Sequence, residues 1–486
     1  MKENGILRGF TFSEDGYVGT HYEFFSVADD FGDTAVMRIN ITITDTAPVA
    51  HPLGILLTTA QRNYTTDIQA GSSDADGDPT FSYDYNLPAP SQPNIANLTF
   101  DNSQVNIINI DPVAVGTTVY TLPYTDTQLT TYGTFTTQVI DPTLTGTVAI
   151  DSADGVETPF TGSLDGTGGI DKTGAGILTF LAPSTYTGAT TVSAGTLRVG
   201  ASNVLSDASA VILDAGTTLD LLTANTSDTI GSLAGAGQVL LGSASTLTVG
   251  YDNTSTTFSG VISGDGNLTK IGTGNFTLNT TNTYTGTTTI NAGQLTLDYS
   301  GLGSNAANLL SGSPLAFGTG TSSTATLLLK NAVGGGATTQ TFESISTGGG
   351  TDYILADPAA GTTISLSTST LTLGGTIIVG VTNPAQENQF TFNVASTPSF
   401  DSSGSVPVSL LYTLDGGVDP ANLFFTQING GVVSRHVADL NPTGNYTGAA
   451  NTAQIRLTTT GAAQSWTNSG DISASSGLLF VGADDY

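Results

Sequence analysis

One stretch of the sequence occurs twice, and this repeat constrains the fold more than any other feature. Residues 185–199 read TYTGATTVSAGTLRV, and residues 283–297 read TYTGTTTINAGQLTL, 98 residues further on. The full aligned units, 160–199 and 258–297, share 17 identical residues in 40 positions without a gap. Self-similarity at a fixed spacing is typical of architectures that stack one unit on the next. We therefore expect a stacked fold rather than one globular core.

Each copy has the residue pattern of several short strands separated by turns. In the first copy the expected strands are 177–181, 189–192 and 195–199, rich in Thr, Val and Leu. A spacing of 98 residues is too long for one coil, and it predicts four or five coils of about 20–25 residues. Stacking places like residues above like, so we expect inward columns of Leu, Ile and Val and hydrogen-bonded ladders of Thr or Asn.

The unit resembles the passenger-associated transport repeat, also called the autotransporter-associated β-strand repeat. Both copies carry Lys-x-Gly-x-Gly, then Thr-Tyr-Thr-Gly-x-Thr-Thr, then Gly-x-Leu. The resemblance implies a right-handed parallel β-helix in a secreted protein of the bacterial surface. No run of aromatic-rich amphipathic strands resembling the usual translocator barrel closes this chain, which leaves the export route open. The structural residues of the repeat are Lys172, Gly174, Gly176, Tyr186, Gly188 and Gly195, with Lys270, Gly272, Gly274, Tyr284, Gly286 and Gly293 in the second copy.

These repeated residues fit structural roles without any ligand. Glycines suit corners that need a positive φ. We expect the two tyrosines to cover a corner or coil edge, and the two lysines to hold down a loop or an acidic neighbour. The alternative is that an exposed tyrosine and lysine contact glycans. Repeated residues in solenoids are usually packing residues, which favours the structural role.

Two segments before the repeat have the period-2 alternation of antiparallel strands. Residues 10–46 contain a hairpin pattern, DTAPVA at 45–50 forms the join, and residues 47–141 form a second segment of similar texture. Both resemble the cadherin-like and Ig-like tandem modules of large bacterial surface proteins. The resemblance implies a partial module over 1–46 and a β-sandwich over 47–141. The first module is partial because its first strands are absent from residues 1–46. Either these strands precede the given sequence in a longer chain, or another chain supplies them by strand addition.

An acidic turn in the second module suggests bound calcium. Asp74, Asp76 and Asp78 alternate in DADGD, and Asp45 lies at the join between the modules. Calcium takes six to eight oxygen ligands, and closely spaced carboxylates supply several of them. In the resembled family such segments often hold Ca²⁺ between modules. The alternative is an ordinary Asp/Gly turn. Position 85 is tyrosine, so the segment lacks the closing glutamate of an EF-hand.

Charge and composition exclude several partners. The net charge is −30, from 40 acidic against 10 basic residues, which argues against nucleic acid and against anionic membranes. The chain has no cysteine, and hence no disulfide framework. No run of 18 apolar residues is present, so we expect no membrane insertion. The N-terminus has no apolar region of a signal peptide, so we expect the export signal and the anchor to lie outside this sequence.

The rest of the chain continues the β pattern. We expect a β-helix over 142–382 and terminal coils or a β cap over 383–486, because stacked folds need their open ends covered. Two alternatives stay open for the function. The chain could be a self-assembling filament or surface-layer subunit joined by strand complementation, or a β-helix polysaccharide lyase or hydrolase.

Catalytic signatures are sparse. The histidines His21, His51 and His436 form no metal-spaced cluster. The one mildly suggestive mixture is Asp415, Asp419, Arg435 and His436, outside the repeats. We therefore expect no enzyme, but an all-β extracellular surface protein, an adhesin or a structural stalk. Its expected partners are surface glycans, other cell-surface proteins or copies of itself.

Overall fold

A computed structural model of the chain describes two compact units, one of residues 1–141 with 155–158 and the other of residues 142–154 with 159–486. Among the described residues, the regular elements are strands apart from one 3-10 helix, η2 (Pro384–Gln389), so the described fold is all-β. The described residues are 19–28, 34–43, 49–50, 53–60, 64–67, 72–73, 96–100, 107–112, 115–125, 130–302, 306–318, 324–331, 336–395, 399–400, 409–413, 416, 423–429 and 432–435.

The first unit contains four small groups of paired strands. β1 (Gly19–Ala28) and β2 (Thr34–Ile43) form an antiparallel hairpin, and β3 (Val49–Ala50) pairs with β6 (Ser72–Ser73). β10 (Thr130–Ile140) pairs antiparallel with β9 (Gly116–Thr125) and parallel with β4 (Leu53–Thr58). β8 (Ile107–Pro112) pairs antiparallel with both β5 (Tyr64–Asp67) and β7 (Ala96–Phe100). Whether these sheets form an Ig-like sandwich stays a prediction.

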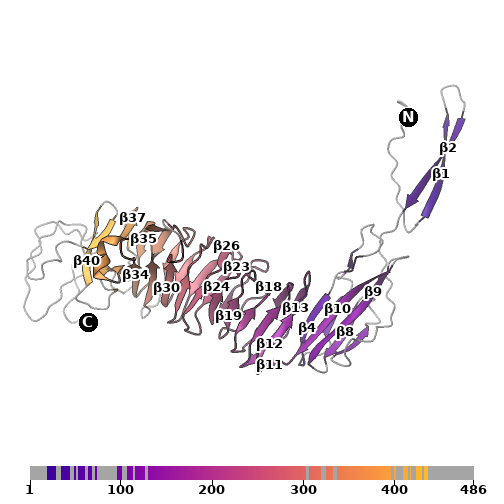
Figure 1. The fold of residues 1–486 in the computed structure, drawn as a ribbon, viewed down its shortest axis with the longest axis horizontal. Helices are drawn as coiled ribbons and strands as arrows, with labels where there is room; N and C mark the ends of the chain where they lie inside the picture. Colours follow the sequence, from indigo (N-terminus) through magenta and orange to yellow (C-terminus); the bar gives the residue numbers. More distant parts are fainter. Residues whose placement is uncertain are drawn as a thin grey trace, which may run out of the picture. The chain divides into compact units, whose positions relative to one another are not determined.

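The second unit is a parallel β-solenoid with three faces (Figure 1). Its first face consists of β12 (Val148–Asp151), β15 (Ile170–Thr173), β17 (Thr190–Val192), β19 (Ala210–Leu213), β22 (Ser232–Gly235), β25 (Thr256–Phe258), β28 (Asn275–Leu278), β30 (Gly293–Asp298), β32 (Ala325–Lys330), β34 (Thr351–Asp357), β36 (Thr376–Val381) and β39 (Ser409–Thr413). These twelve strands are joined by eleven parallel pairings, which correspond to eleven turns.

The other two faces have strands over different stretches of the solenoid, the second over residues 157–264 and the third over residues 228–394. The second face consists of β13 (Glu157–Phe160), β16 (Ile177–Phe180), β18 (Thr196–Val199), β20 (Thr218–Asp220), β23 (Gln238–Leu241) and β26 (Val261–Gly264). The third face consists of β21 (Asp228–Ile230), β24 (Thr246–Val249), β27 (Asn267–Lys270), β29 (Thr288–Ile290), β31 (Leu315–Phe317), β33 (Ala337–Ser346), β35 (Thr363–Leu373) and β37 (Phe390–Val394). In the first coils, β11 (Thr143–Leu144) pairs parallel with β14 (Asp165–Gly166).

The core is a set of apolar columns that run along the solenoid. Leu178, Leu197, Leu219 and Val239 follow one another on the second face, and all four are fully buried. Phe160 and Phe180, on neighbouring coils, meet edge to face with their ring centroids 5.1 Å apart. Each apolar residue is thus covered by the coils before and after it, and the solenoid is stabilised by neighbour contacts rather than by one globular core. The expected apolar columns are confirmed.

The strand register gives the length of a coil. On the first face the residues that directly follow one another are Lys172, Val192, Leu213, Gly235, Phe258 and Leu278. Five coils therefore take 278 − 172 = 106 residues, or about 21 residues for each coil. This length falls within the predicted range.

Towards the C-terminus the coils become longer and the pairing changes. On the first face, Thr351 lies beside Thr376 and Thr376 beside Ser409, which are steps of 25 and 33 residues. Parallel pairing thus continues beyond residue 382, up to β39. β40 (Leu423–Asn429) and β41 (Val432–Arg435) then pair antiparallel with each other.

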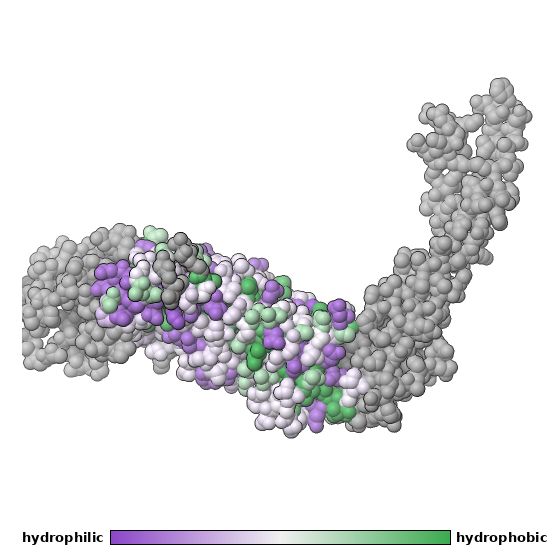
Figure 2. Space-filling model, viewed as in Figure 1, coloured by the Kyte–Doolittle hydropathy of each residue, from purple (hydrophilic) through white to green (hydrophobic). Residues whose placement is uncertain are grey.

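The surface of the solenoid is of mostly intermediate hydropathy with scattered apolar patches, as one side of it in Figure 2 shows. Large exposed apolar side chains are few among the described residues; those on the solenoid are Leu181, Leu222 and Tyr251. Within the described part of the chain, no helix has the length and apolar character needed to span a bilayer.

Candidate functional site

The repeated lysine points into the solenoid instead of outward. Lys172 is 0% exposed and stands in an inward column between Ile150 and Val192. Its ammonium group donates hydrogen bonds to the carbonyl oxygens of Thr173, Gly174 and Ala194, at 2.8, 2.7 and 3.1 Å. Ala194 belongs to the next coil, so the lysine joins two coils at one corner. Its aliphatic stem packs among apolar neighbours while its charge meets main-chain oxygens.

The second lysine makes the same contacts. Lys270 is 1% exposed and stands between Val249 and Ile290. Its ammonium group donates to the carbonyls of Ile271, Gly272 and Ala292, at 2.5, 2.9 and 3.2 Å. Each acceptor lies 98 residues after its counterpart in the first copy.

Burial perturbs the protonation of both lysines. It lowers the pKa of Lys172 to about 8 because the charged form loses water, and the negative charge of Asp151 partly offsets this. The pKa of Lys270 is also lowered to about 8 by burial, with Asp252 acting in the opposite direction. Both side chains therefore stay mainly protonated at neutral pH, as their three carbonyl acceptors require.

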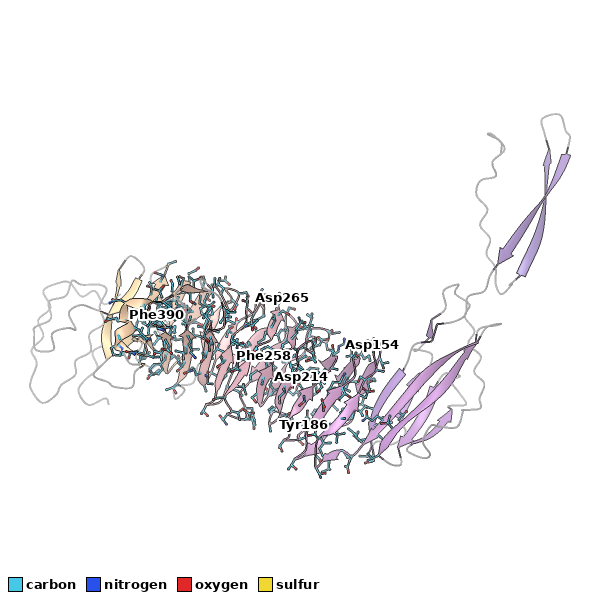
Figure 3. All side chains as sticks on the ribbon, viewed as in Figure 1. Asp154, Tyr186, Asp214, Phe258, Asp265 and Phe390 are labelled. Carbon is cyan, nitrogen blue, oxygen red and sulfur yellow. The ribbon has the colours of Figure 1, made fainter. Side chains whose placement is uncertain are left out.

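The repeated tyrosines are also buried inside the solenoid, and Figure 3 labels the position of the first, Tyr186. Tyr186 and Tyr284 are both 0% exposed. Each hydroxyl lies 2.6 Å from the hydroxyl of the threonine four residues later, Thr190 or Thr288. Burial raises the pKa of Tyr186 to about 12 and raises that of Tyr284 as well. Neither the tyrosines nor the lysines are accessible to a glycan.

Glycine is required where one coil approaches the next. Gly195 and Gly293 have φ values of +68° and +67°, which favour glycine. A Cβ at Gly195 would lie 2.3 Å from the carbonyl oxygen of Gly176, and one at Gly293 would lie 2.4 Å from that of Gly272. Gly188, Gly274 and Gly286 have equally close backbone neighbours in the preceding coil, and Gly174 and Gly272 have positive φ.

The two copies lie on different faces of the solenoid. In copy one the strand that carries the lysine, β15, lies on the first face, whereas its equivalent in copy two, β27, lies on the third face. The next strand of copy two, β28, belongs to the column of β15 and not to that of its equivalent, β16. A shift of 98 residues at about 21 per coil is about four and two-thirds coils. The two lysines therefore do not share a column: the column of Lys172 contains Phe258 and Leu278, not Lys270.

Other residues predicted to bind or react lie outside the part of the chain that the structure describes. This holds for the calcium candidates Asp45, Asp74, Asp76 and Asp78 and for Asp415, Asp419 and His436. Arg435 ends β41, where only the backbone is described. Among the described residues, no three His, Asp or Glu side chains gather in a way that could hold a metal ion.

Three buried carboxyl groups were not predicted: Asp220 pairs with Arg198, and the other two have no ion pair among the described residues. Asp228 is 2% exposed, and its Oδ2 accepts hydrogen bonds from the amides of Val204 and Leu205, at 2.9 and 3.1 Å. Asp352 is 0% exposed, and neither of its oxygens has a hydrogen-bond partner; the Ala325 amide lies nearby without hydrogen-bond geometry. Burial raises the pKa of Asp228 and that of Asp352 to about 7. These two take inward strand positions that the alternation could have identified as unusual sites for an acid.

Comparison with known proteins identifies the repeat. Residues 170–199 and 268–297 match the passenger-associated-transport-repeat family. The chain is 41% identical over 181 residues to the adhesin BmaC autotransporter of Brucella suis biovar 1 (strain 1330). That match covers 36% of this chain and 5% of the adhesin, so the chain spans about a twentieth of its relative's length.

Solved structures add little. Two structures of an endo-fucoidan hydrolase from glycoside hydrolase family 107 align at TM-scores of 0.16 and 0.17 with 12% identity. The alignments cover 28% of this chain and 23% of the hydrolase. Similarity at this level carries no argument about fold or activity.

Proposed function

We propose that this chain is part of a non-catalytic, extracellular adhesin-type passenger on a bacterial surface, with the solenoid as its rod. The observation that carries the proposal is the sequence similarity to an autotransporter adhesin, combined with the burial of the matched repeat residues. Because Lys172, Tyr186 and their counterparts all pack inside, the repeat supplies scaffold, and adhesion belongs to the outward surface. No observation favours a lyase, a hydrolase or a strand-complemented filament.

The surface location is tested on intact cells of the source bacterium. An antibody against the solenoid should label unlysed cells, and external protease should remove the label. Labelling that needs lysis would contradict the proposal. Beads coated with the purified chain should attach to cells that display surface glycans and proteins, and soluble chain should compete for this attachment. Attachment no stronger than that of albumin-coated beads would contradict the proposed adhesin function but would not bear on the surface location.

The first unit is proposed to act as a spacer of cadherin-like or Ig-like modules. Its support is the resemblance of residues 1–141, together with the parallel pairing of β4 with β10 and the antiparallel pairing of β9 with β10. Within residues 47–141, this pairing joins β4, the first strand longer than two residues, to β10, the last. Calcium bound by Asp45, Asp74, Asp76 and Asp78 would stiffen this spacer. A rise in the melting temperature with Ca²⁺ over chelator, absent when Asp76 and Asp78 become asparagine, tests that site; no rise contradicts it.

A further inference from the structure

One peptide bond at the boundary between the two compact units joins an aspartate to a proline. The longer segment of the first unit ends at Asp141, and the second unit begins at Pro142. Asp141 directly follows β10, and Pro142 directly precedes β11. The sequence contains five Asp-Pro bonds, and this is the one that coincides with a boundary between the units.

An aspartate followed by proline has the groups needed to break its own main chain. A side-chain oxygen of the aspartate reaches the carbonyl carbon of the same residue by closing a five-membered ring, so nucleophile and target are held together. The proline nitrogen belongs to a tertiary amide without an N–H. Once it takes up a proton, it leaves as a secondary amine. Mild acid favours the reaction, because it supplies protons while part of the carboxyl groups stays ionised.

The chain is anchored on both sides of the bond between Asp141 and Pro142. The carbonyl oxygen of Ile140 accepts a hydrogen bond from the amide of Thr59 at 3.0 Å, and that of Pro142 accepts from the amide of Asp165 at 2.8 Å. Between these anchors the Asp141 side chain is exposed, and Pro142 is half-buried. Water and protons therefore reach this bond while the chain is folded.

The bond between Asp357 and Pro358 provides a comparison within the same chain. Asp357 ends β34, and its carboxylate accepts a hydrogen bond from the Thr382 hydroxyl at 3.1 Å. Pro358 is buried, so its nitrogen is shielded from the proton that must reach it. This bond should therefore resist acid as long as the solenoid is folded. The other three Asp-Pro bonds follow aspartates whose side chains lie outside the described residues: Asp78, Asp111 and Asp419.

We propose that the bond between Asp141 and Pro142 is a self-cleavage site that divides the chain between its two units in mild acid. A carboxylate oxygen of Asp141 attacks the carbonyl carbon of the same residue, and a proton passes from the solvent to the nitrogen of Pro142. The C–N bond breaks, which leaves a cyclic anhydride on Asp141 and a free amine on Pro142. Water then opens the anhydride to two carboxyl groups. The net reaction is the hydrolysis of one peptide bond by one water molecule.

The cut would separate residues 1–141 from residues 142–486. It falls between β10 and β11, so it interrupts no strand. An acidic environment would thus act as the signal that ends the covalent link between the proposed spacer and the rod. The inference concerns one bond of the purified chain. It can therefore fail while the proposed adhesin function stands, and the reverse also holds.

Incubation of the purified full chain at pH 4 and 37 °C tests the proposal, with mass spectrometry of samples denatured after the incubation. We expect fragments that end at Asp141 and begin at Pro142, formed at least about tenfold faster than those from the bond after Asp357. In concentrated urea at the same pH, the two bonds should break at similar rates, because burial no longer distinguishes them. At pH 7.5 the folded chain should stay intact at both bonds.

Two variants separate this reaction from ordinary proteolysis. Asp141→Glu keeps the charge but must close a six-membered ring, and Pro142→Ala restores an ordinary secondary amide; each should slow the cut by about tenfold or more. The matched control, Asp357→Glu, should leave the cut after Asp141 unchanged. Circular dichroism at pH 4 confirms that each variant is folded.

Three results would overturn the proposal. The first is a folded chain that stays intact between Asp141 and Pro142 at pH 4. The second is equal cleavage of this bond and the bond after Asp357 in the folded chain, because the structure would then not select the site. The third is a cut that persists at full rate in Pro142→Ala, which would identify a contaminating protease as its cause.

Discussion

Lys172 and Lys270 hold the same position in the two copies of the repeat, yet they lie on different faces of the solenoid. Both bond three equivalent carbonyls, two in the following corner and one in the next coil. All three acceptors lie within the same copy as the lysine. Each repeat unit therefore contains both the lysine and the carbonyls that bind it. For this reason the unit can occupy different faces of the solenoid.

Replacement of either lysine by methionine should destabilise the solenoid by about 1–3 kcal/mol. Methionine keeps the apolar stem but leaves three carbonyls without their charged donor. The cost should be similar for Lys172→Met and Lys270→Met, because their contacts are equivalent. Urea denaturation measures the change, and hydrogen exchange at the adjacent corner should localise it. The control is Lys330→Met, whose ammonium group lies 3.6 Å from Asp298 and is 46% exposed; it should cost less than about 0.5 kcal/mol. Equal costs for all three would contradict the role of the buried lysines.

Loss of the buried tyrosine hydroxyl should cost about 0.5–1.5 kcal/mol, and more in the second copy than in the first. In the first copy Thr190 retains the Ser209 hydroxyl at 2.8 Å after Tyr186→Phe. In the second, the register places Ser313 at the equivalent position, but its hydroxyl has no partner, so Tyr284→Phe leaves Thr288 unpaired. Thermal unfolding measures both variants. Tyr251→Phe, at a side chain 54% exposed, should change nothing. A larger loss for Tyr186→Phe than for Tyr284→Phe would refute this ranking.

Alanine at the repeated corner glycines should be severely destabilising. Gly195→Ala and Gly293→Ala place a Cβ 2.3 and 2.4 Å from a carbonyl oxygen of the preceding coil, in addition to the cost of a positive φ. We expect more than about 3 kcal/mol for each. Gly216→Ala is the matched control, because Gly216 has φ +86° but nothing within 4 Å of its Cβ, so it should cost only about 1–2 kcal/mol. Equal losses at all three sites would show that strain alone, and not coil contact, requires glycine.

Asp228 and Asp352, whose pKa values burial raises, should make the solenoid more stable in mild acid. The pKa of Asp352 is raised from 3.8 to about 7 in the folded state, so between these values the folded chain binds more protons than the unfolded chain. The free energy of unfolding therefore falls as pH rises through this window. The lysines do not contribute there, because their pKa of about 8 places their effect between pH 8 and 10.5.

Asparagine imitates the protonated acid, so Asp352→Asn should be more stable than the unaltered chain at pH 8. The two should have similar stability near pH 4. Melting temperatures at pH 4, 5.5 and 8 measure this, with Asp214→Asn on an exposed side chain as the control. If the unaltered chain and Asp352→Asn differ equally at every pH, the ionisation of Asp352 does not affect folding.

The repeat predicted the stacked fold and the coil length because strand periodicity and glycine spacing are local properties. Residues 177–181 and 189–192 were expected as strands, and β16 and β17 lie there. The face of each copy was not predicted, since it depends on the lengths of all intervening coils. The inward direction of Lys172 was also missed, because a lysine in an alternating strand is normally assigned to solvent. The burial of Asp352 likewise depends on its register with Ala325 and Ile377 in the neighbouring coils.

The central claim is the register that separates the two copies, and disulfide mapping in this cysteine-free chain tests it most directly. In the first-face column that starts at Thr191, each of the pairs 191/212, 212/234, 234/257 and 257/277 should close as cysteines on oxidation, because adjacent strands lie within disulfide distance. The pair 269/289 should close in its own column on the third face, while the shifted pair 257/275 stays reduced. Peptide mapping by mass spectrometry reads the bonds. This result would place Thr191 and its equivalent, Thr289, on different faces. A disulfide between 257 and 275, with 257 and 277 still reduced, would contradict the strand register and with it the placement of the two copies on different faces.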